Sequence, residues 1–180
     1  MRVIRPRHGL VCAVAALAAA TAFGSPTDPA APSCPPHLFV LGRSKNANVV
    51  VYDAVREPSG DLAASEPVVA YWLLDGNEDK REDLNLIERE RAYGISAEPG
   101  NAPGTFAIRF KANGRRRFVL RVLNGCPVVT GSIGGHDGIL RRIFVHSKEG
   151  ALGPKVQSVE LFGKDVASGK DLHDKFVPKK

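Results

Sequence analysis

Arginine is the residue type whose spacing in this chain most clearly suggests a chemical role. The basic residues of interest lie in the second half of the chain, at Arg115, Arg116, Arg117, Arg121, Arg141 and Arg142. Side chains alternate between the two faces of a strand, so Arg115, Arg117 and Arg121 would share one face. That face is either a solvated outer surface or, if Arg141 or Arg142 lies beside it, a site for an anionic ligand such as a phosphorylated glycan or a lipid headgroup.

Signatures for phosphate and metal binding are incomplete. Five residues separate Gly163 from Gly169, whereas a phosphate loop has four between its glycines, and Asp171 stands where that loop needs Ser or Thr. Metal sites need ligands at short fixed spacings. The histidines after the N-terminal region are instead far apart in the sequence, at His37, His136, His146 and His173. The sequence therefore predicts neither a metal nor a cofactor.

Candidate catalytic pairs are also incomplete. His136 and Asp137 could act as a general base with its orienting carboxylate, but between glycines this pair is more typical of a solvated turn. Ser44 and Lys45 are adjacent, so on a strand they would point to opposite faces and could not form a dyad. The chain has no Gly-x-Ser-x-Gly motif. These observations lean toward a protein that is not an enzyme.

The N-terminal residues have the pattern of a secretory signal peptide. Three arginines precede a run rich in Ala, Val and Leu from Gly9 to Phe23, and small residues follow it. We predict a signal peptide over residues 1–24 and an exported protein, periplasmic or secreted. A membrane anchor is the alternative, but the uncharged run is shorter than the ~20 residues that cross a bilayer. No transmembrane segment is expected after cleavage.

Part of the positive charge of the chain belongs to this segment. Cleavage would remove Arg2, Arg5 and Arg7, leaving 22 basic residues against 19 acidic ones and lowering the formal charge from +6 to +3. A charge of this size is ordinary for a small domain and does not indicate a nucleic-acid partner.

Two cysteines, Cys34 and Cys126, would remain in the mature protein. An even pair in an oxidising compartment is most simply a disulfide. A lipid-anchored Cys34 is a second possibility, although Ala31-Pro32-Ser33 is a poor match to the motif that precedes such a cysteine. Two free thiols are the third.

The rest of the chain predicts one β-rich domain. Residues 25–36 are a Pro- and Ala-rich linker, and residues 37–178 are long enough to bury a core. Short apolar runs separated by Gly, Pro, Asn and Asp predict strands at 37–42, 48–54, 68–74, 105–110, 116–123, 128–133, 139–146 and 156–162. We predict a mainly β fold, an antiparallel barrel or sandwich of about eight strands with one packed α-helix.

One segment favours that helix. Asp79 and Glu82 have the spacing of a capping box, and Gly94 stands where a left-handed C-cap would fall. We predict a helix of about twelve residues between them. Its apolar side, expected to pack on the sheet, would consist of Leu84, Leu86, Ile87 and Tyr93.

Three stretches combine polar and aromatic residues in the pattern of a known family. They are Arg43-Ser44-Lys45-Asn46 with Asn48 and Val51-Tyr52; Pro67-Val68 with Tyr71-Trp72; and Leu84-Asn85 with Ile87-Glu88-Arg89 and Ala92-Tyr93-Gly94. Together they resemble an uncharacterised family of exported bacterial domains, domain of unknown function 4833, over residues 37 to about 177. The resemblance implies export and a single-domain fold, but no reaction.

The resemblance directs attention to the polar residues in these stretches: Arg43, Asn46, Asn48, Asn85, Glu88 and Arg89. They would form either a buried network or the floor of a ligand pocket. In the network, Arg43 and Arg89 would pair with Glu88 or Asp53 and hold the helix over the sheet. In the pocket, the apolar walls would be Tyr52, Trp72 and Tyr93.

We therefore expect an exported binding or envelope-accessory domain for an anionic or amphipathic ligand. One alternative is an enzyme acting on an envelope glycan or lipid, with Glu88 as general acid or base and Tyr93, Arg43 or Arg89 stabilising charge. Another is a purely structural domain that interacts with proteins.

Overall fold

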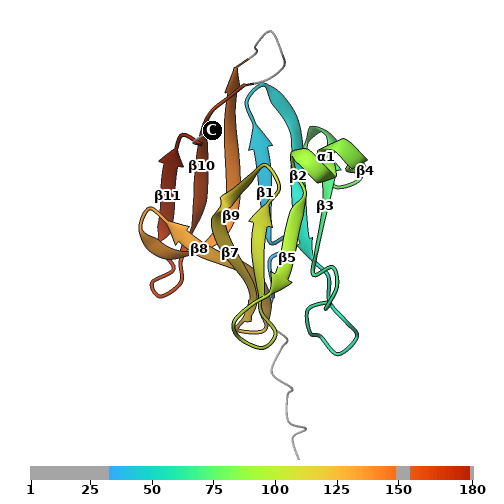
Figure 1. The fold of residues 1–180 in the computed structure, drawn as a ribbon, viewed down its shortest axis with the longest axis vertical. Helices are drawn as coiled ribbons and strands as arrows, with labels where there is room; N and C mark the ends of the chain where they lie inside the picture. Colours follow the sequence, from blue (N-terminus) through green and yellow to red (C-terminus); the bar gives the residue numbers. More distant parts are fainter. Residues whose placement is uncertain (1–32, 149–154, 179–180) are drawn as a thin grey trace, which may run out of the picture. The chain divides into compact units, whose positions relative to one another are not determined.

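The strands that the structure describes belong to a single sheet (Figure 1). The structure is a computed structural model that describes residues 33–148 and 155–178; the predicted signal peptide, and the linker up to residue 32, lie outside the described residues. The strands within them are β1 (Phe39–Arg43), β2 (Asn46–Ala54), β3 (Val68–Leu73), β4 (Arg81–Asp83), β5 (Ile95–Pro99), β6 (Phe106–Phe110), β7 (Asn113–Leu123), β8 (Cys126–Ile133), β9 (His136–Lys148), β10 (Lys155–Asp165) and β11 (Asp171–Phe176). The helical elements are a 3-10 turn, η1 (Leu74–Gly76), and one α-helix, α1 (Leu86–Arg91).

Strand β9 is the branch point of the sheet. The strand order is β4-β3-β2-β1-β9-β8-β7-β6-β5, with β10 and β11 added on the other edge of β9. Along one edge of β9, residues 136–139 pair with β8 and residues 142–145 pair with β1. The β1–β9 pair is parallel, and the remaining pairs between the strands named above are antiparallel. The two arms of the sheet thus start from one strand and curl toward each other.

The prediction of a mainly β fold with one helix is confirmed, and all eight predicted strands are present. The strands form one curled sheet and not two packed sheets. The prediction missed β4, β5 and β11. Each lies at an edge of the sheet, where a strand needs pairing on one side only and can therefore be short or polar. Strand β4, Arg-Glu-Asp, has no apolar residue, so its pattern gave no signal.

The predicted helix is wrong in its start and its length. Residues 81–83 pair with β3 instead, and α1 has six residues. Its capping box consists of Asn85 and Glu88: the N–H of Glu88 donates to Asn85 Oδ1 at 2.9 Å, and the N–H of Asn85 donates to Glu88 Oε2 at 3.0 Å. Gly94 has no left-handed backbone; it is needed because a Cβ there would lie 1.6 Å from the carbonyl oxygen of Arg89.

The predicted packing of the helix is also wrong in part. Leu84, just before α1, is buried, and Tyr93, just after it, packs against the core. Leu86 and Ile87 are 75% and 71% exposed. A helix of six residues is too short to carry a continuous apolar stripe, so only the residues that flank it reach the sheet.

A chain of aromatic rings connects the two arms of the sheet. Phe39 of β1 stacks on Tyr52 of β2 with ring centroids 4.4 Å apart. Phe110 of β6 contacts both rings edge-on at 5.8 Å, and Phe118 of β7 contacts Phe110 at 5.9 Å. Such contacts add about 0.5–1.5 kcal/mol each to the burial of the rings. The core is therefore continuous from the β1–β2 arm to the β6–β7 arm.

The predicted disulfide is confirmed: Cys34 is bonded to Cys126, with Cα atoms 5.3 Å apart. The bond ties the segment that precedes β1 to the first residue of β8.

Replacing Cys34 and Cys126 together by Ala should lower the free energy of unfolding. The bond joins residues 92 positions apart, and the chain-entropy model gives about 4–5 kcal/mol for a loop of this size. Urea denaturation of the wild-type protein, the double variant and the reduced wild type measures this free energy. The double variant and the reduced wild type should give the same value. Equal midpoints and slopes for the oxidised wild type and the variant would contradict it.

Candidate functional site

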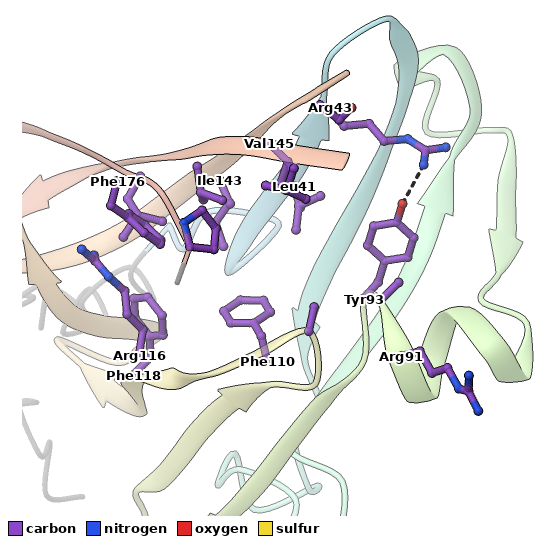
Figure 2. Close-up of a pocket in the computed structure, with 17 residues that line it drawn as sticks. Leu41, Arg43, Arg91, Tyr93, Phe110, Arg116, Phe118, Ile143, Val145 and Phe176 are labelled. Atoms are coloured by element: carbon purple, nitrogen blue, oxygen red, sulfur yellow. Dashed lines mark hydrogen bonds between the residues drawn. The ribbon is translucent and has the colours of Figure 1, made fainter. Parts of the chain in front are cut away.

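An apolar cavity of about 480 Å³ lies between the arms of the sheet (Figure 2). Its walls come from β1, β6, β7, β9, β10 and β11, from the end of α1 and the segment that joins it to β5, from the turn between β6 and β7, and from the C-terminal residues after β11. The lining residues are Leu41, Arg43, Arg91, Ala92, Tyr93, Phe110, Ala112, Arg116, Phe118, Ile143, Val145, Ser147, Val156, Val159, Leu161, Phe176 and Pro178. None of these described residues is acidic, so any charge that the cavity presents is positive.

Strand register explains how one wall is built. Neighbouring strands place paired residues side by side on the same face of a sheet. One such row runs Leu41–Ile143–Leu161, and the next runs Arg43–Val145–Val159–Phe176. Every residue of both rows lines the cavity. The wall is therefore apolar except at Arg43, where β1 ends.

The opposite wall comes from the β6–β7 arm. Phe110 and Phe118 are the last two rings of the aromatic chain in the core, and both also line the cavity (Figure 2). Arg116 has the same strand parity as Phe118, so it shares the inward face. Its guanidinium is paired with Asp174 and lies 4.1 Å from the ring centre of Phe176. The charge of Arg116 is thus largely compensated within the protein.

Arg43 and Tyr93 form the polar part of the rim. Arg43 Nη1 donates a hydrogen bond to the Tyr93 hydroxyl at 2.9 Å (Figure 2). Arg43 makes no ion pair with a described residue, and its guanidinium lies 5.4 Å from the Trp72 ring centre. Burial raises the pKa of Tyr93 despite the opposing charge of Arg43, so the hydroxyl keeps its proton. The pair can therefore offer several N–H donors and one O–H donor to an anion.

Two core residues, Tyr52 and Trp72, hold Tyr93 in place. The Tyr52 hydroxyl donates to the Tyr93 carbonyl at 2.8 Å, and the Trp72 ring meets the Tyr93 ring edge-on at 4.9 Å. Tyr52 and Trp72 are both buried in the core. Of the three aromatic residues expected to form pocket walls, only Tyr93 lines the cavity; the other two support it.

The other residues of the predicted polar cluster lie elsewhere. Asn46 and Asn48 hold turns, since Asn46 Oδ1 accepts from the N–H of Asn48 and Asn48 Oδ1 accepts from the N–H of Asp75, both at 2.9 Å. Asn85 and Glu88 cap α1, and Arg89 is exposed. None of these residues lines the cavity. The carboxylate of Glu88, the candidate general acid or base, instead accepts the N–H of Asn85 in the helix cap.

The ion pairs suggested for a buried network are not formed. Asp53 accepts hydrogen bonds from His37 at 2.7 Å and from the Tyr71 hydroxyl at 2.6 Å, and neither Arg43 nor Arg89 pairs with it. Strand alternation separates Arg116 from Arg115, Arg117 and Arg121, the three residues of the predicted basic face. Arg116 faces the cavity, Arg115 and Arg117 are exposed, and Arg121 lies 3.8 Å from Asp137.

Sequence reasoning missed the β9–β11 wall and Arg116. The alternation of Ile143, Val145 and Ser147 was visible, but the pairing of β1 with β9 across 100 residues was not. Arg116 could have been predicted as a cavity residue. Side chains alternate along a strand, so Arg116 shares a face with Phe118 and Leu120, and Arg115 and Arg117 lie on the other face.

A second cluster of titratable groups lies on β10 and its neighbours. The Glu160 carboxylate, 15% exposed, is bound by Lys175 at 3.0 Å, His173 at 2.9 Å and His146 at 2.7 Å. Lys175 and the hydrogen bond from His173 lower the pKa of Glu160 to about 2. Among residues 33–148 and 155–178 no group of His, Cys, Asp and Glu is arranged to hold a metal ion.

The fold and the cavity define a mainly β domain built around an apolar space with a basic rim. Residues 39–175 match the family described as Domain of unknown function (DUF4833), and the chain belongs to this family. The family noted from the sequence is thereby confirmed, and export stays a prediction. No curated protein and no solved structure shows significant similarity to the chain. In the described residues, no helix has the length and apolar character needed to span a membrane.

The Glu160 cluster makes a prediction about acid stability. A carboxyl whose pKa falls from 4.5 to about 2 on folding stabilises the protein above pH 4.5, and this contribution is lost as the pH falls toward 2. The difference in unfolding free energy between wild type and Glu160→Gln should therefore shrink as the pH falls from 4.5 toward 2. Urea denaturation across this range measures it. A difference that does not vary with pH would contradict the assignment.

Proposed function

We propose that this protein is a binding domain for an anionic ligand with one long apolar chain, such as a fatty acid or a lysophospholipid. The observation that carries the proposal is the apolar cavity whose rim bears Arg43, a cation that is hydrogen-bonded to Tyr93 and has no ion-pair partner among the described residues. No reaction is assigned to the site.

The apolar part of the ligand would occupy the walls formed by β1, β7, β9 and β10. A volume of about 480 Å³ falls within the ~300–1,000 Å³ of small-molecule sites. Each buried methylene contributes about 0.8 kcal/mol, and 1.4 kcal/mol is a tenfold change in affinity. Affinity should therefore rise about fourfold per methylene until the cavity is filled.

The charged end of the ligand would lie at Arg43 and Tyr93. The Tyr93 hydroxyl already accepts a hydrogen bond from Arg43 and can still donate its own proton, so both groups can bind one anion. Hydrogen bonds that involve a charged group contribute about 1.5–3 kcal/mol. Tyr52 and Trp72 hold Tyr93 before any ligand binds, which lowers the cost of ordering the site.

Export to the periplasm or the medium is part of the proposal. The disulfide between Cys34 and Cys126 supports it, because such bonds persist in oxidising compartments. The N-terminal sequence supports it independently. In an envelope, the ligand class would be that of free fatty acids and single-chain lipids.

Calorimetric titration with n-alkyl carboxylates and n-alkyl phosphates of increasing chain length tests the proposal. We expect affinity to rise with chain length and then level off. Arg43→Gln should weaken binding about tenfold to a hundredfold. Arg142→Gln is the matched control, because Arg142 lies on β9, the strand that pairs with β1, but is exposed and does not line the cavity.

Two results would contradict the proposal. One is equal binding of short and long chains, which would mean that the cavity walls are not used. The other is an equal effect of the two arginine substitutions, which would mean that net charge and not the rim binds the anion. A preference for carboxylate or phosphate at equal chain length would identify which headgroup the rim fits.

A further inference from the structure

Two arginine side chains outside the cavity have buried nitrogens without a hydrogen-bond partner. In the part of the chain that the structure describes, the side-chain N and O atoms that are closed to solvent and lack a partner are Arg121 Nε and Arg141 Nη1. Most buried polar groups in folded proteins are hydrogen-bonded, and each exception requires an explanation. Two such atoms in cationic side chains indicate positive charge that the fold itself does not compensate.

A β-bulge in β9 turns Arg141 to the outer face of the sheet. Between two successive pairs with β10, β9 has one residue more than β10, and that residue is Arg141. The core contains both Leu140 and Ile143, so the two residues between them, Arg141 and Arg142, both face outward. Bulges often re-aim a side chain next to a functional site.

Strand register places Arg141 close to Arg121. Arg121 of β7 pairs with Val128 of β8. On the other side of β8, Thr130 pairs with Ile139, and the same antiparallel register continued by two residues sets Val128 beside Arg141. The two arginines are thus two strand spacings apart, about 10 Å. Val128 is 3% exposed and belongs to neither apolar cluster of the core, as expected if the two arginine side chains cover it.

The carboxylates on this face leave the two guanidiniums largely uncompensated. Asp137 lies 3.8 Å from Arg121, which is too far for a hydrogen bond. Asp171 is paired with Lys164 at 2.7 Å. Arg141 makes no ion pair or hydrogen bond with a described residue, and burial lowers its pKa.

Two further carboxylates of β10 are also engaged within the protein. Asp165 Oδ1 accepts hydrogen bonds from the N–H groups of Ala167 and Ser168 at 3.1 and 2.7 Å. Glu160 is bound by the two histidines and the lysine described above. Arg117 is exposed on the outer face of β7 and adds a further positive charge. The outer face of β7, β8 and β9 is therefore basic.

Burial of one edge of each guanidinium prepares its other edge for a ligand. The charge of a guanidinium is delocalised and its N–H groups have a fixed planar geometry. An anion at the accessible edge can therefore compensate charge that is buried at the opposite edge. Arg121 is 33% exposed and Arg141 is half-buried, so each has an accessible edge. Packing of the buried edge also lowers the entropy cost of ordering these side chains on binding.

We propose that Arg121 and Arg141 form a binding site for a phosphate monoester on the outer face of β7, β8 and β9. Arginine binds phosphate and carboxylate through paired N–H groups. A phosphate monoester carries a charge of about −1.5 to −2 at pH 7 and has three acceptor oxygens, which suits two guanidiniums better than the single charge of a carboxylate. The ligand would be a sugar phosphate or the phosphate headgroup of a lipid. The site is separate from the cavity, which neither arginine lines.

Calorimetric titration of the full mature protein with inorganic phosphate tests the site, at about pH 8, above the second phosphate pKa of ~6. We expect saturable binding that is stronger than the binding of acetate. Arg121→Gln and Arg141→Gln should each weaken it roughly tenfold to a hundredfold. Arg142→Gln is the matched control, because it removes the same charge from the same face. The guanidinium of Arg142 lies over the rings of Phe144 and Phe162, so this variant should bind phosphate like the wild type.

Arg141→Met gives a second measurement, which does not depend on the folding of Arg141→Gln. It removes the charge of Arg141 but keeps an apolar side chain over Val128. Phosphate should raise the melting temperature of the wild type, because a ligand of the folded state stabilises it, and should leave that of Arg141→Met unchanged. Sodium chloride at equal ionic strength controls for screening. Without phosphate, Arg141→Met should be at least as stable as the wild type, because it removes a buried donor without a partner.

Three results would overturn the inference. They are no phosphate binding by the wild type, an equal loss of binding in the three Arg→Gln variants, and acetate binding as tight as phosphate binding. The cavity proposal fails or succeeds separately. Arg43→Gln should bind inorganic phosphate like the wild type, and Arg141→Gln should bind long alkyl carboxylates like the wild type.

Two probes distinguish the sources of the phosphate group. Glucose 6-phosphate represents a sugar phosphate, and phosphatidylcholine vesicles that contain phosphatidic acid represent a lipid headgroup. Binding of either probe that is lost in Arg141→Gln supports the site and identifies the source. Binding of neither, with inorganic phosphate still bound, would overturn the assignment to a phosphate monoester.

Discussion

The structure depends on the pairing of strand β9 with two different strands along one edge. Residues 136–139 of β9 hydrogen-bond to β8, and residues 142–145 hydrogen-bond to β1 in the parallel direction. The arms that continue from β8 and β1 cannot remain in one flat layer, so they curl toward each other from a common strand. The aromatic chain from Phe39 to Phe118 fills part of the space between them, and the remainder is the cavity.

The same pairing decides which side chains meet at the cavity. Parallel register aligns Leu41 with Ile143 and Arg43 with Val145, and β10 extends both rows. Arg43 is the last residue of β1, so its charge falls at the rim and not in the apolar interior. Across the rim, Tyr93 is fixed by buried groups of β2 and β3. The apolar wall and the charged rim are therefore consequences of strand alternation and strand length.

Much of the fold could be predicted from the sequence. Eight strands followed from apolar alternation and turn residues, because those patterns are local and each central strand must bury one face. Strands β4 and β11 could not be predicted, because edge strands are stabilised by a neighbour and not by their own apolar residues. The helix was misplaced because Asp79–Glu82 and Asn85–Glu88 both have capping-box spacing, and pairing of residues 81–83 with β3 decided between them.

The sequence by itself determined the mainly β class and the family, and it made a bond between Cys34 and Cys126 the simplest expectation. These conclusions depend on composition and on short local patterns, which do not require knowledge of the tertiary structure. Only the tertiary structure decided that Tyr52 and Trp72 contact Tyr93 from the core and do not line the cavity. It also decided that Glu88 caps a helix and that β9, β10 and β11 form a cavity wall. The pairing that joins β1 to this wall connects residues about a hundred positions apart, and local patterns contain no information about which distant strands will pair.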